Sequence, residues 1–433
     1  MKNFNWVKEL ESKKILLWGY GLEGKSSYRF LRSFFPEKEL YIADQSEKEY
    51  SILAQTEYTY FVKEEEIYDG NFDLILKSPG IVVKDTRIPK EILSGQAPLF
   101  LKHYRDQVIG VTGTKGKSTT TSLIHAVLSQ SYHTHLVGNI GKPCFDILHD
   151  LKDEDLVAFE ISCHQLEYAC DSPHVAVYLN LFEEHLDHYG SYEAYCFAKD
   201  QIFLHQKEED ILFIGKQIEQ RAAHFPHVVI GKEIYADGLT MHFQEETCEV
   251  KETKLLGSHN AQNMAIAYAI GKLYGISDAK FQDAIASFQP LPHRLEYIGE
   301  KEGIKFIDDS ISTIGQSCIQ ALEALGNTDT VLIGGMDRGI DYTELENYIM
   351  HHHEIDYIFM YATGKRIYEE LKAKGYQRDT LHLVEDLEEA VALAKKLTRM
   401  NRYCLLSPAA SSYDHFKNFE ERGDVFRKLA LEE

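Results

Sequence analysis

Residues 110–121 read GVTGTKGKSTTT. An apolar run that begins at Val108 leads into this stretch, and a helix-like segment with one apolar stripe follows it. A strand, a glycine-rich turn, Lys-Ser and a helix, in this order, are typical of a loop that binds phosphate. Gly113 and Gly116 let the backbone bend so that several N–H groups point at one anion, and the helix N-terminus adds partial positive charge. The stretch therefore predicts a site for nucleotide phosphates.

Two side chains of this loop are suited to act on a bound nucleotide. Lys117 can reach the terminal phosphates, and Ser118 can offer its hydroxyl to Mg²⁺. The general pattern has glycine at the position of Val111. A glycine- and threonine-rich surface turn is the alternative, but the strand before the loop and the helix after it favour phosphate binding.

Length, composition and charge limit the classes of protein to which the chain can belong. The 433 residues carry a formal net charge of −22, with 44% apolar and 26% charged residues. That length accommodates about two to four domains, and the acidic balance argues against a non-specific nucleic-acid binder. The 7 cysteines have irregular spacing and no CxxC pair, which is typical of free thiols in a reducing cytosol. The N-terminus lacks a signal-peptide core and no apolar run is long enough to span a membrane, so we expect a cytoplasmic protein.

The N-terminal segment has the pattern of a nucleotide-binding α/β unit. An apolar strand, Lys13–Trp18, runs into a GxGxxG turn at Gly19–Gly24, and a second strand, Leu40–Ala43, ends at Asp44. An acidic residue about twenty positions after the glycines can hydrogen-bond a ribose. A third strand ends in the tight loop KSPGI, residues 77–81, at the kind of strand end where ligands bind in open α/β sheets. GxGxxG alone is a weak signal, so an NAD(P) site and a plain tight turn both stay open.

The middle segment places further polar residues at strand ends. Two apolar runs, Leu156–Phe159 and Val175–Leu181, predict parallel strands that are covered on both faces. Glu160 follows the first run, and His185 lies a few residues beyond the second. Because the carboxyl ends of parallel strands meet at one edge of a sheet, both side chains should face the phosphates. A carboxylate and a neutral imidazole can hold Mg²⁺ when phosphate oxygens and water complete its shell.

Each of these residues has a plainer alternative. Glu160 can be a solvated carboxylate at a strand end. His185 can belong to a structural Zn²⁺ site with Asp187 and His188. Lys199 follows a helix-like run and, taken alone, reads as a solvated surface charge.

From His293 onward strands and helices alternate again, which predicts a second doubly wound unit. The expected strands are Ile304–Ile307, Thr330–Ile333, Tyr357–Tyr361, Leu381–Val384 and Tyr403–Leu406. The His351–His353 run is expected on the surface rather than in a metal site.

Taken together, these motifs resemble the Mur ligase family. The shared features, in chain order, are the GxGxxG unit, GTKGKST, Gly138-Asn139-Ile140-Gly141, Asn180 with Glu184-His185, a lysine soon after, His259-Asn260, Pro292-His293-Arg294 and Ser407-Pro408-Ala409. The resemblance covers essentially the whole chain. The segment LLSPAASSYDHFKNFEERG, residues 405–423, is its most specific piece and is similar to the MurD type. That type joins D-glutamate to UDP-N-acetylmuramoyl-L-alanine.

The resemblance implies an α/β protein of three domains. Residues 1–104 would form a Rossmann-like domain for the UDP substrate, residues 105–292 a P-loop ATPase domain with a parallel sheet, and residues 293–433 a Rossmann-like domain for the amino acid. The protein would be a monomer that uses ATP and two Mg²⁺ ions. It would add D-glutamate to UDP-N-acetylmuramoyl-L-alanine through an acyl phosphate and release ADP and phosphate, as a step of peptidoglycan synthesis.

The resemblance also assigns roles to individual residues. The catalytic residues would be Lys117, Glu160, His185 and Lys199. ATP would be held by Gly113, Thr114, Lys115, Gly116, Lys117, Ser118, Thr119, Asn260, Asn263, Arg294 and Asp309. The UDP substrate would be held by Leu22, Asp44, Ser78, Pro79, Gly80, Asn139 and Ser162. Glutamate would be held by Thr313, Arg338, Ser412 and Phe419.

The metal ligands implied by the resemblance are Ser118, Glu160, His185 and Lys199 as its carbamate. An ammonium beside two Mg²⁺ ions is repelled, whereas the CO₂ adduct of the lysine is an anion that can bind metal. The resemblance therefore replaces the surface reading of Lys199 with a functional one.

The chain departs from the family pattern at three places. Residues 162–165 read SCHQ instead of SSFQ, Glu23 replaces a threonine, and Ile311 replaces the lysine of Asp-Ser-Lys-x-Thr. That lysine belongs to the glutamate end of the site, so its loss opens a second reading in which L-glutamate is added. D-glutamate is the first expectation because of the C-terminal match.

Two other classes of protein compete with a ligase. An NAD(P)-dependent dehydrogenase built on GxGxxG leaves residues 110–121 and the C-terminal unit unexplained. A non-catalytic ATP-binding partner protein conflicts with the presence of every expected metal-side residue.

Overall fold

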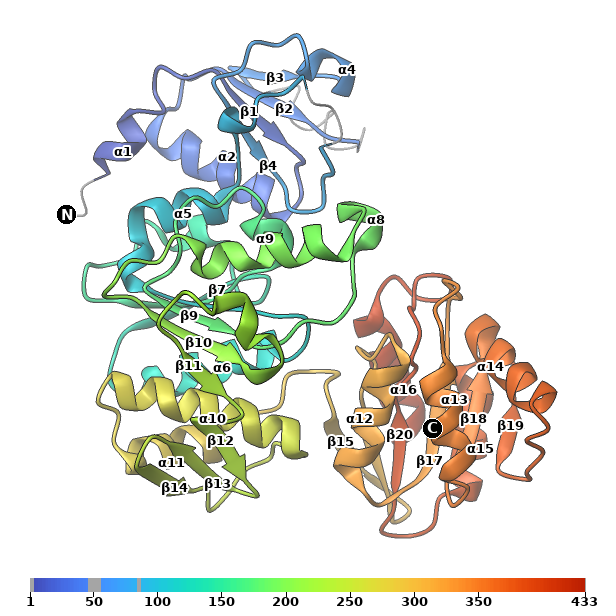
Figure 1. Cartoon of the computed structure of the whole chain (residues 1–433). Helices are drawn as coiled ribbons and strands as arrows, with labels where there is room; N and C mark the ends of the chain where they lie inside the picture. Colours follow the sequence, from blue (N-terminus) through green and yellow to red (C-terminus); the bar gives the residue numbers. More distant parts are fainter. Residues whose placement is uncertain (1–3, 46–55, 84–86, 433) are drawn as a thin grey trace. The chain divides into compact units, whose positions relative to one another are not determined.

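Three β-sheets organise the chain, and each contains consecutive strands of the sequence (Figure 1). The computed structural model describes residues 4–45, 56–83 and 87–432. The chain divides into two compact units, Met1–Glu252 with Gln262–Ala286 and Thr253–Ala261 with Ser287–Glu433. The first unit holds two sheets and the second unit holds the third.

The N-terminal sheet has five parallel strands in the order β3-β2-β1-β4-β5. They are β1 (Ile15–Trp18), β2 (Leu40–Ala43), β3 (Thr59–Phe61), β4 (Leu74–Lys77) and β5 (Leu93–Ser94). The accompanying helices are α1 (Asn5–Lys8), α2 (Leu22–Phe34), α4 (Glu64–Ile67) and α5 (Gln96–Tyr104). This confirms the Rossmann-like arrangement, in which the strand order runs outward on both sides of β1.

Two glycines of the GxGxxG turn allow close backbone packing. Gly19 has φ +93°, and a Cβ there would lie 2.6 Å from Oγ of Ser78. A Cβ on Gly24 would lie 2.0 Å from the carbonyl oxygen of Gly19, so a side chain at position 24 would push α2 away from the end of β1. A Cβ on Gly21 would meet nothing within 4 Å, which leaves its backbone open to a ligand.

The central sheet has nine strands in the order β14-β13-β12-β11-β10-β9-β6-β8-β7. They are β6 (Val108–Thr112), β7 (Thr134–Gly138), β8 (Leu156–Glu160), β9 (Val175–Tyr178), β10 (Ile211–Gly215), β11 (Val228–Ile230), β12 (Ile234–Asp237), β13 (Thr240–Phe243) and β14 (Glu246–Glu249). The helices of this part are α6 (Lys117–Leu128), α7 (Cys163–Leu166), α8 (Leu186–Tyr189), α9 (Tyr192–Leu204), α10 (Ser258–Leu273) and α11 (Asp278–Ser287).

The expected parallel sheet is present from β7 to β12, but its other edge is antiparallel. β13 runs antiparallel to both β12 and β14. Tight turns connect these strands, with Gly238 and Gln244 in the left-handed region of φ. β13 also alternates half-buried and buried residues, unlike the fully buried run of β9. The short strands near residue 240 therefore lack the continuous apolar run that marks the parallel strands in the sequence.

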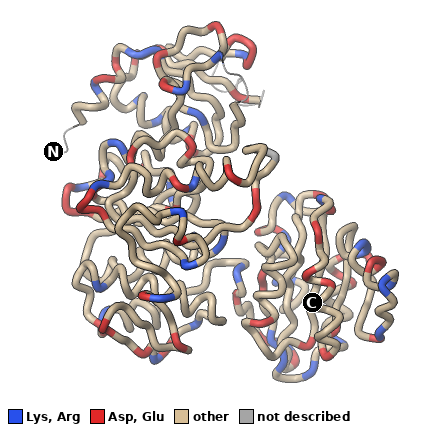
Figure 2. The backbone as a smooth tube through the Cα atoms, viewed as in Figure 1, with Lys and Arg blue, Asp and Glu red and all other residues tan. Residues whose placement is uncertain are grey.

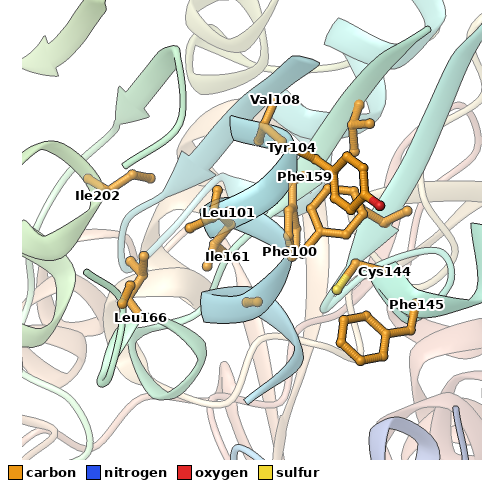
Figure 3. Close-up of a cluster of buried hydrophobic side chains, with 14 of the residues drawn as sticks. Phe100, Leu101, Tyr104, Val108, Cys144, Phe145, Phe159, Ile161, Leu166 and Ile202 are labelled. Carbon is orange, nitrogen blue, oxygen red and sulfur yellow. The ribbon is translucent and has the colours of Figure 1, made fainter. Parts of the chain in front are cut away.

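One apolar core extends across both sheets of the first unit. Phe100 and Leu101 of α5 are fully buried and belong to the same cluster as Val108 and Phe159 of the central sheet. Figure 3 shows these side chains with Phe145, which follows β7. The N-terminal helix α1 joins this cluster through Trp6, whose indole N–H donates to the Tyr104 hydroxyl at 3.0 Å.

The third sheet has six strands in the order β15-β16-β20-β17-β18-β19. They are β15 (Glu296–Lys301), β16 (Ile304–Asp308), β17 (Thr328–Gly334), β18 (Asp356–Met360), β19 (Leu381–Leu383) and β20 (Tyr403–Leu406). Its helices are α12 (Gly315–Leu325), α13 (Thr343–His351), α14 (Tyr361–Ala373), α15 (Leu387–Leu397) and α16 (Phe419–Leu431). β15 is antiparallel to β16, and the other five strands are parallel, as the alternation of strands and helices predicts.

Charged residues are spread over both units. Figure 2 shows Asp and Glu along most of the described chain, with Lys and Arg between them. Among the described residues, none of the helices is long and apolar enough to cross a lipid bilayer.

The amino ends of the central strands are joined by a buried ion pair. The guanidinium of Arg105 contacts the carboxylate of Asp210 and also donates to the carbonyl of Ser172 at 2.8 Å. His174 lies 2.9 Å from the other oxygen of the same carboxylate. Arg105 therefore links the segments that lead into β6, β9 and β10.

We expect Arg105→Met to lower the free energy of unfolding of the first unit by roughly 3–5 kcal/mol, because it leaves a buried carboxylate without its cation. The measurement is urea denaturation followed by circular dichroism. Arg29→Met is the matched control, because the Arg29 side chain in the Arg29–Asp146 pair is 60% exposed. Its loss should lower the free energy of unfolding by less than about 1 kcal/mol. Equal losses for the two variants would contradict this account of Arg105.

Candidate active site

The loop between β6 and α6 turns where two glycines take conformations that other residues avoid. Gly113 has φ +147° and Gly116 has φ +86°. A Cβ on Gly113 would lie 3.0 Å from the Cβ of Leu179, and a Cβ on Gly116 would lie 3.3 Å from Oδ1 of Asn263. These approaches explain why both positions are glycine and why the loop packs closely against its neighbours.

Asn180 holds the first half of this loop in place. Its Oδ1 accepts the backbone amides of Thr114 at 3.2 Å and Lys115 at 2.8 Å, and its Nδ2 donates to the carbonyl of Lys115 at 3.0 Å. The amides of Thr114 and Lys115 are therefore already used. An anion would instead meet the first turn of α6, where the helix N-terminus adds partial positive charge.

The charged side chains of the loop lie among acidic neighbours. Lys115 pairs with Glu184 at 2.7 Å, and the ammonium of Lys117 donates to the Thr114 carbonyl at 2.8 Å. Burial lowers the pKa of Lys117, while Glu160 and Glu184 act in the opposite direction. The nearby carboxylates therefore favour the charged form of Lys117, which is the form that stabilises phosphate.

Glu160 ends β8 with one oxygen paired and the other unpaired. The residue is 1% exposed, and Oε1 accepts from the amide of Asn139 at 3.2 Å. Oε2 is buried and has no hydrogen-bond partner among the described residues. A buried carboxylate oxygen without a donor is costly unless a cation or water completes it. The oxygen of Glu160 and the buried hydroxyl of Ser118 are hard ligands, which fit Mg²⁺.

Lys199 is buried, which corrects the interpretation that it is a surface charge. It lies inside α9, is 2% exposed, and its Nζ donates to the carbonyl of Gly113 at 2.7 Å. Burial is the main cause that lowers its pKa to about 7, and the charge of Lys117 adds to the shift. A lysine in this state is partly a neutral amine near neutral pH, and only the neutral amine reacts with CO₂.

His185 lies at the start of α8 and is exposed. It has φ +58°, and its ring is 4.7 Å from that of His164. Nε2 of His188 faces Glu167 and lies 3.5 Å from one of its carboxylate oxygens. The Zn²⁺ alternative also needed Asp187, whose side chain lies outside the described part of the structure. The rings of His164, His185 and His188 otherwise form a small aromatic cluster with Tyr189.

The structure brings most of the expected UDP-substrate residues into one cavity of about 860 Å³. Its lining includes Leu22, Asp44, Ser78, Pro79, Gly80 and Asn139. Leu22 is 80% exposed, and Asp44 accepts the backbone amide of Tyr20 at 2.5 Å. Ser162 is not in the lining and instead caps α7 by accepting the amide of Gln165 at 3.3 Å.

Residues from the two sheets of the first unit meet at this cavity. Gln165, which follows β8 in the chain, lines it, and its amide donates to Glu23 at 2.6 Å. Burial raises the pKa of Glu23, while the hydrogen bond from Gln165 lowers it. Residues of both sheets therefore line the cavity, including the GxGxxG loop of the first and Gln165 of the second.

Sequence reasoning missed Lys77, which shapes the loop that follows β4. Its side chain is 2% exposed, pairs with Glu167 at 3.1 Å and donates to the carbonyl of Ile81 at 2.7 Å. Burial lowers its pKa, and Glu167 opposes that shift. The only signal in the sequence is a lysine at the end of an apolar strand, where a solvated side chain is the ordinary expectation.

In the second unit, three loops follow adjacent strand ends. β16, β20 and β17 are neighbours in the sheet, and Thr313, Ser412 and Arg338 come from the loops after them. The Arg338 loop is tied to the Ser412 loop by a hydrogen bond from the Met336 amide to the Ser411 carbonyl at 2.8 Å. The expected glutamate residues thus share one edge of the sheet.

Arg338 is available to bind an anion. It is exposed, and it has no hydrogen-bond or ion-pair partner among the residues that the structure describes. The adjacent Asp337 is held by Arg366 at 2.8 Å, so it does not neutralise Arg338. Ser412 is 4% exposed.

Phe419 begins α16 close to the segment where the family lysine is replaced. Its carbonyl accepts the hydroxyl of Ser310 at 2.7 Å. The guanidinium of Arg422, fully buried, donates to the Ser310 carbonyl at 2.8 Å. Ile311 itself is half-buried, and its amide donates to the His293 carbonyl at 3.2 Å. Arg422 was not among the expected site residues, although it supports the same loop.

The remaining expected ATP residues are divided between the two units. Asn263 belongs to the first unit, where its Oδ1 accepts the hydroxyl of Thr120 at 3.1 Å. Asn260, Arg294 and Asp309 belong to the second unit. Asp309 is buried and accepts hydrogen bonds from Ser312 at 2.5 Å and Ser407 at 2.8 Å. Burial raises its pKa to about 7, against the effect of these hydroxyls.

Known proteins resemble this chain over nearly its whole length. Residues 111–271 match the Mur ligase middle domain. The chain is 30% identical to the UDP-N-acetylmuramoyl-L-alanine–L-glutamate ligase of Xanthomonas axonopodis, over 98% of the chain and 96% of the relative. It is also 30% identical to the UDP-N-acetylmuramoylalanine–D-glutamate ligase of Alkaliphilus metalliredigens, over 97% of the chain and 98% of the relative.

A solved structure shares the whole fold. MurF of Acinetobacter baumannii aligns over 98% of each chain with a TM-score of 0.66 and 17% sequence identity. That similarity concerns the fold, whereas the sequence relatives establish descent. The chain therefore belongs to the Mur ligase family.

Proposed function

We propose that this protein is an ATP-dependent ligase that joins glutamate to UDP-N-acetylmuramoyl-L-alanine. One observation carries the proposal: Asn139 lines the substrate cavity and also donates to Glu160, beside the phosphate loop. A substrate whose UDP end lies at the GxGxxG loop would extend its other end toward the ATP site. A dehydrogenase would not need a substrate cavity that is connected to a phosphate-binding loop.

The reaction needs two displacements. A carboxylate oxygen of the alanyl end attacks the γ-phosphorus of ATP, and ADP leaves. The amine of glutamate then attacks the acyl carbon and loses a proton, and phosphate leaves with one oxygen of the original carboxylate. Lys117 and the first amides of α6 stabilise the charge on the transferring phosphoryl group.

The residues suited to hold Mg²⁺ are Glu160, Ser118, His185 and Lys199 as its carbamate. Bound Mg²⁺ would supply neutralisation of the charge on the phosphate oxygens. Asn139 orients Glu160, and the Gly113 carbonyl positions the amine of Lys199 for reaction with CO₂.

The wider assignment follows from the same proposal. We place the domain boundaries near residues 104 and 292 and expect a monomer. All seven cysteines are free, which supports a reducing compartment such as the cytoplasm.

We propose D-glutamate as the isomer, on the strength of the C-terminal segment 405–423. L-glutamate is the second candidate, favoured by Ile311 in place of the family lysine and by the name of the Xanthomonas relative. Both isomers carry two carboxylates, so both need Arg338.

Lys117→Ala should abolish turnover and leave binding of the UDP substrate nearly unchanged, because Lys117 acts on the phosphoryl group and not on the cavity. ADP release and calorimetric titration with the UDP substrate measure the two effects. Lys102→Ala, which removes an exposed helix lysine of the same unit, is the control. Turnover of Lys117→Ala within about tenfold of the wild type, or ~1.4 kcal/mol of barrier, would be incompatible with this role.

Lys199→Ala should be nearly inactive, and acetate should restore part of the rate by replacing the carbamate as an anion near the metal. With a pKa of about 7, the amine of Lys199 loses its proton as pH rises through neutrality, so carbamylation should increase from pH 6 to pH 8. Intact-protein mass spectrometry at several pH values, with and without bicarbonate, detects the added CO₂. A fully active enzyme that carries only the free amine would refute the proposal.

The isomer is decided by ADP release with D-glutamate and L-glutamate at equal concentration. We expect faster turnover with D-glutamate; faster turnover with the L isomer would select the second candidate. Arg338→Ala should raise the KM for glutamate about ten- to hundredfold, the equivalent of about 1.5–3 kcal/mol for a charged hydrogen bond. Arg378→Ala, at an exposed position of the same unit, should leave KM unchanged. Turnover with lysine or alanine but neither glutamate would reject both candidates.

A further inference from the structure

Two histidines and a buried aspartate meet at the edge of the central sheet. His133 immediately precedes β7, His135 lies within it, and Asp155 immediately precedes β8. Nδ1 of His133 and Nε2 of His135 lie 3.0 Å and 2.9 Å from the same oxygen of Asp155. The three potential ligand atoms all lie within 4.8 Å of one another.

The carboxylate of Asp155 is incompletely satisfied. The side chain is 1% exposed. Its Oδ2 contacts the two imidazole nitrogens and also accepts the backbone amide of Lys152 at 3.0 Å. Oδ1 is buried and has no hydrogen-bond partner among the described residues. Three donors therefore converge on one oxygen while the other has none, an arrangement that an ion or a water would complete.

The chemistry of these ligands selects a transition metal. We propose that His133, His135 and Asp155 form a binding site for one Zn²⁺ ion, with water as the fourth ligand. Two imidazole nitrogens with a single carboxylate oxygen form a ligand set that suits Zn²⁺ better than Mg²⁺, which needs mostly oxygen ligands such as those of a bound phosphate. In a tetrahedral Zn²⁺ site adjacent ligand atoms are about 3.3 Å apart. The two contacts between histidine nitrogen and Asp155, at 3.0 Å and 2.9 Å, therefore need to widen by only a few tenths of an ångström.

The surroundings also favour a cation. The turn before β8 reads Lys152-Asp153-Glu154-Asp155, with Asp153 and Glu154 exposed. His133 has a side chain that is 66% exposed, which gives a metal ion and its water an open approach.

The proposed site is separate from the candidate active site. It lies at the amino ends of β7 and β8, whereas Glu160 ends β8 at its carboxyl end. Asp155 and Glu160 are five positions apart, a distance of about 17 Å along the strand. Zn²⁺ here would join β7, which is an edge strand, to the turn that precedes β8. We therefore expect a stabilising site rather than a catalytic one.

The test is calorimetric titration of Zn²⁺ into the full chain with Mg²⁺ in large excess. The parent is the variant His185→Ala, His351→Ala, His353→Ala, which lacks three exposed imidazoles that could compete for Zn²⁺. We expect this parent to bind one equivalent of Zn²⁺ and to gain thermal stability from it. Adding His133→Ala or His135→Ala should weaken Zn²⁺ binding at least about tenfold, because each removes one of three protein ligands.

The matched control adds His242→Ala instead, which removes a histidine of β13 that stacks on Tyr235 in the same sheet. Its Zn²⁺ affinity should equal that of the parent. His133→Ala is the most informative variant, because its exposed side chain can be removed without disturbing the fold. Substitution of the buried Asp155 could instead unfold the protein. Unchanged Zn²⁺ affinity in His133→Ala, an equal loss in His242→Ala, or a parent that binds no Zn²⁺ would each overturn the proposal.

Discussion

The candidate active site depends on one hydrogen bond, from the buried amine of Lys199 to the carbonyl of Gly113. It fixes α9 against the loop between β6 and α6, and it holds a basic group where water cannot solvate its charge. Burial in turn lowers the pKa of Lys199 to about 7, which makes its amine available to CO₂. The same contact thus positions the loop and prepares the lysine for modification.

Close backbone approach explains how the neighbouring groups reach this point. A Cβ on Gly138 would lie 2.1 Å from the carbonyl of Glu160, so only glycine lets the end of β7 come beside the end of β8. Asn139 then follows directly and reaches both Glu160 and the substrate cavity. The parallel strands bring these ends to one edge of the sheet, where open α/β folds bind their ligands.

Much of this was predictable from local pattern. Leu40–Ala43 and Tyr403–Leu406 form strands with the expected bounds, and the glycines of residues 110–121 form the expected loop. Contacts between distant segments were not predictable. Nothing in the sequence showed that Asn180 would occupy the amides of Thr114 and Lys115, or that the side chain of Lys77 would be buried.

Two further features show the same limit. Lys199 looked like a surface residue because α9 is apolar on more than one side, so no amphipathic pattern marked its buried face. His133 and Asp155 are 22 positions apart in the printed sequence, and only the pairing of β7 with β8 brings them together.

The central claim is that the candidate active site activates a carboxylate by phosphorylation. It is tested most directly with heavy oxygen in the alanyl carboxylate of the UDP substrate. The account predicts that one labelled oxygen appears in the released phosphate; phosphate released without label during product formation would contradict it.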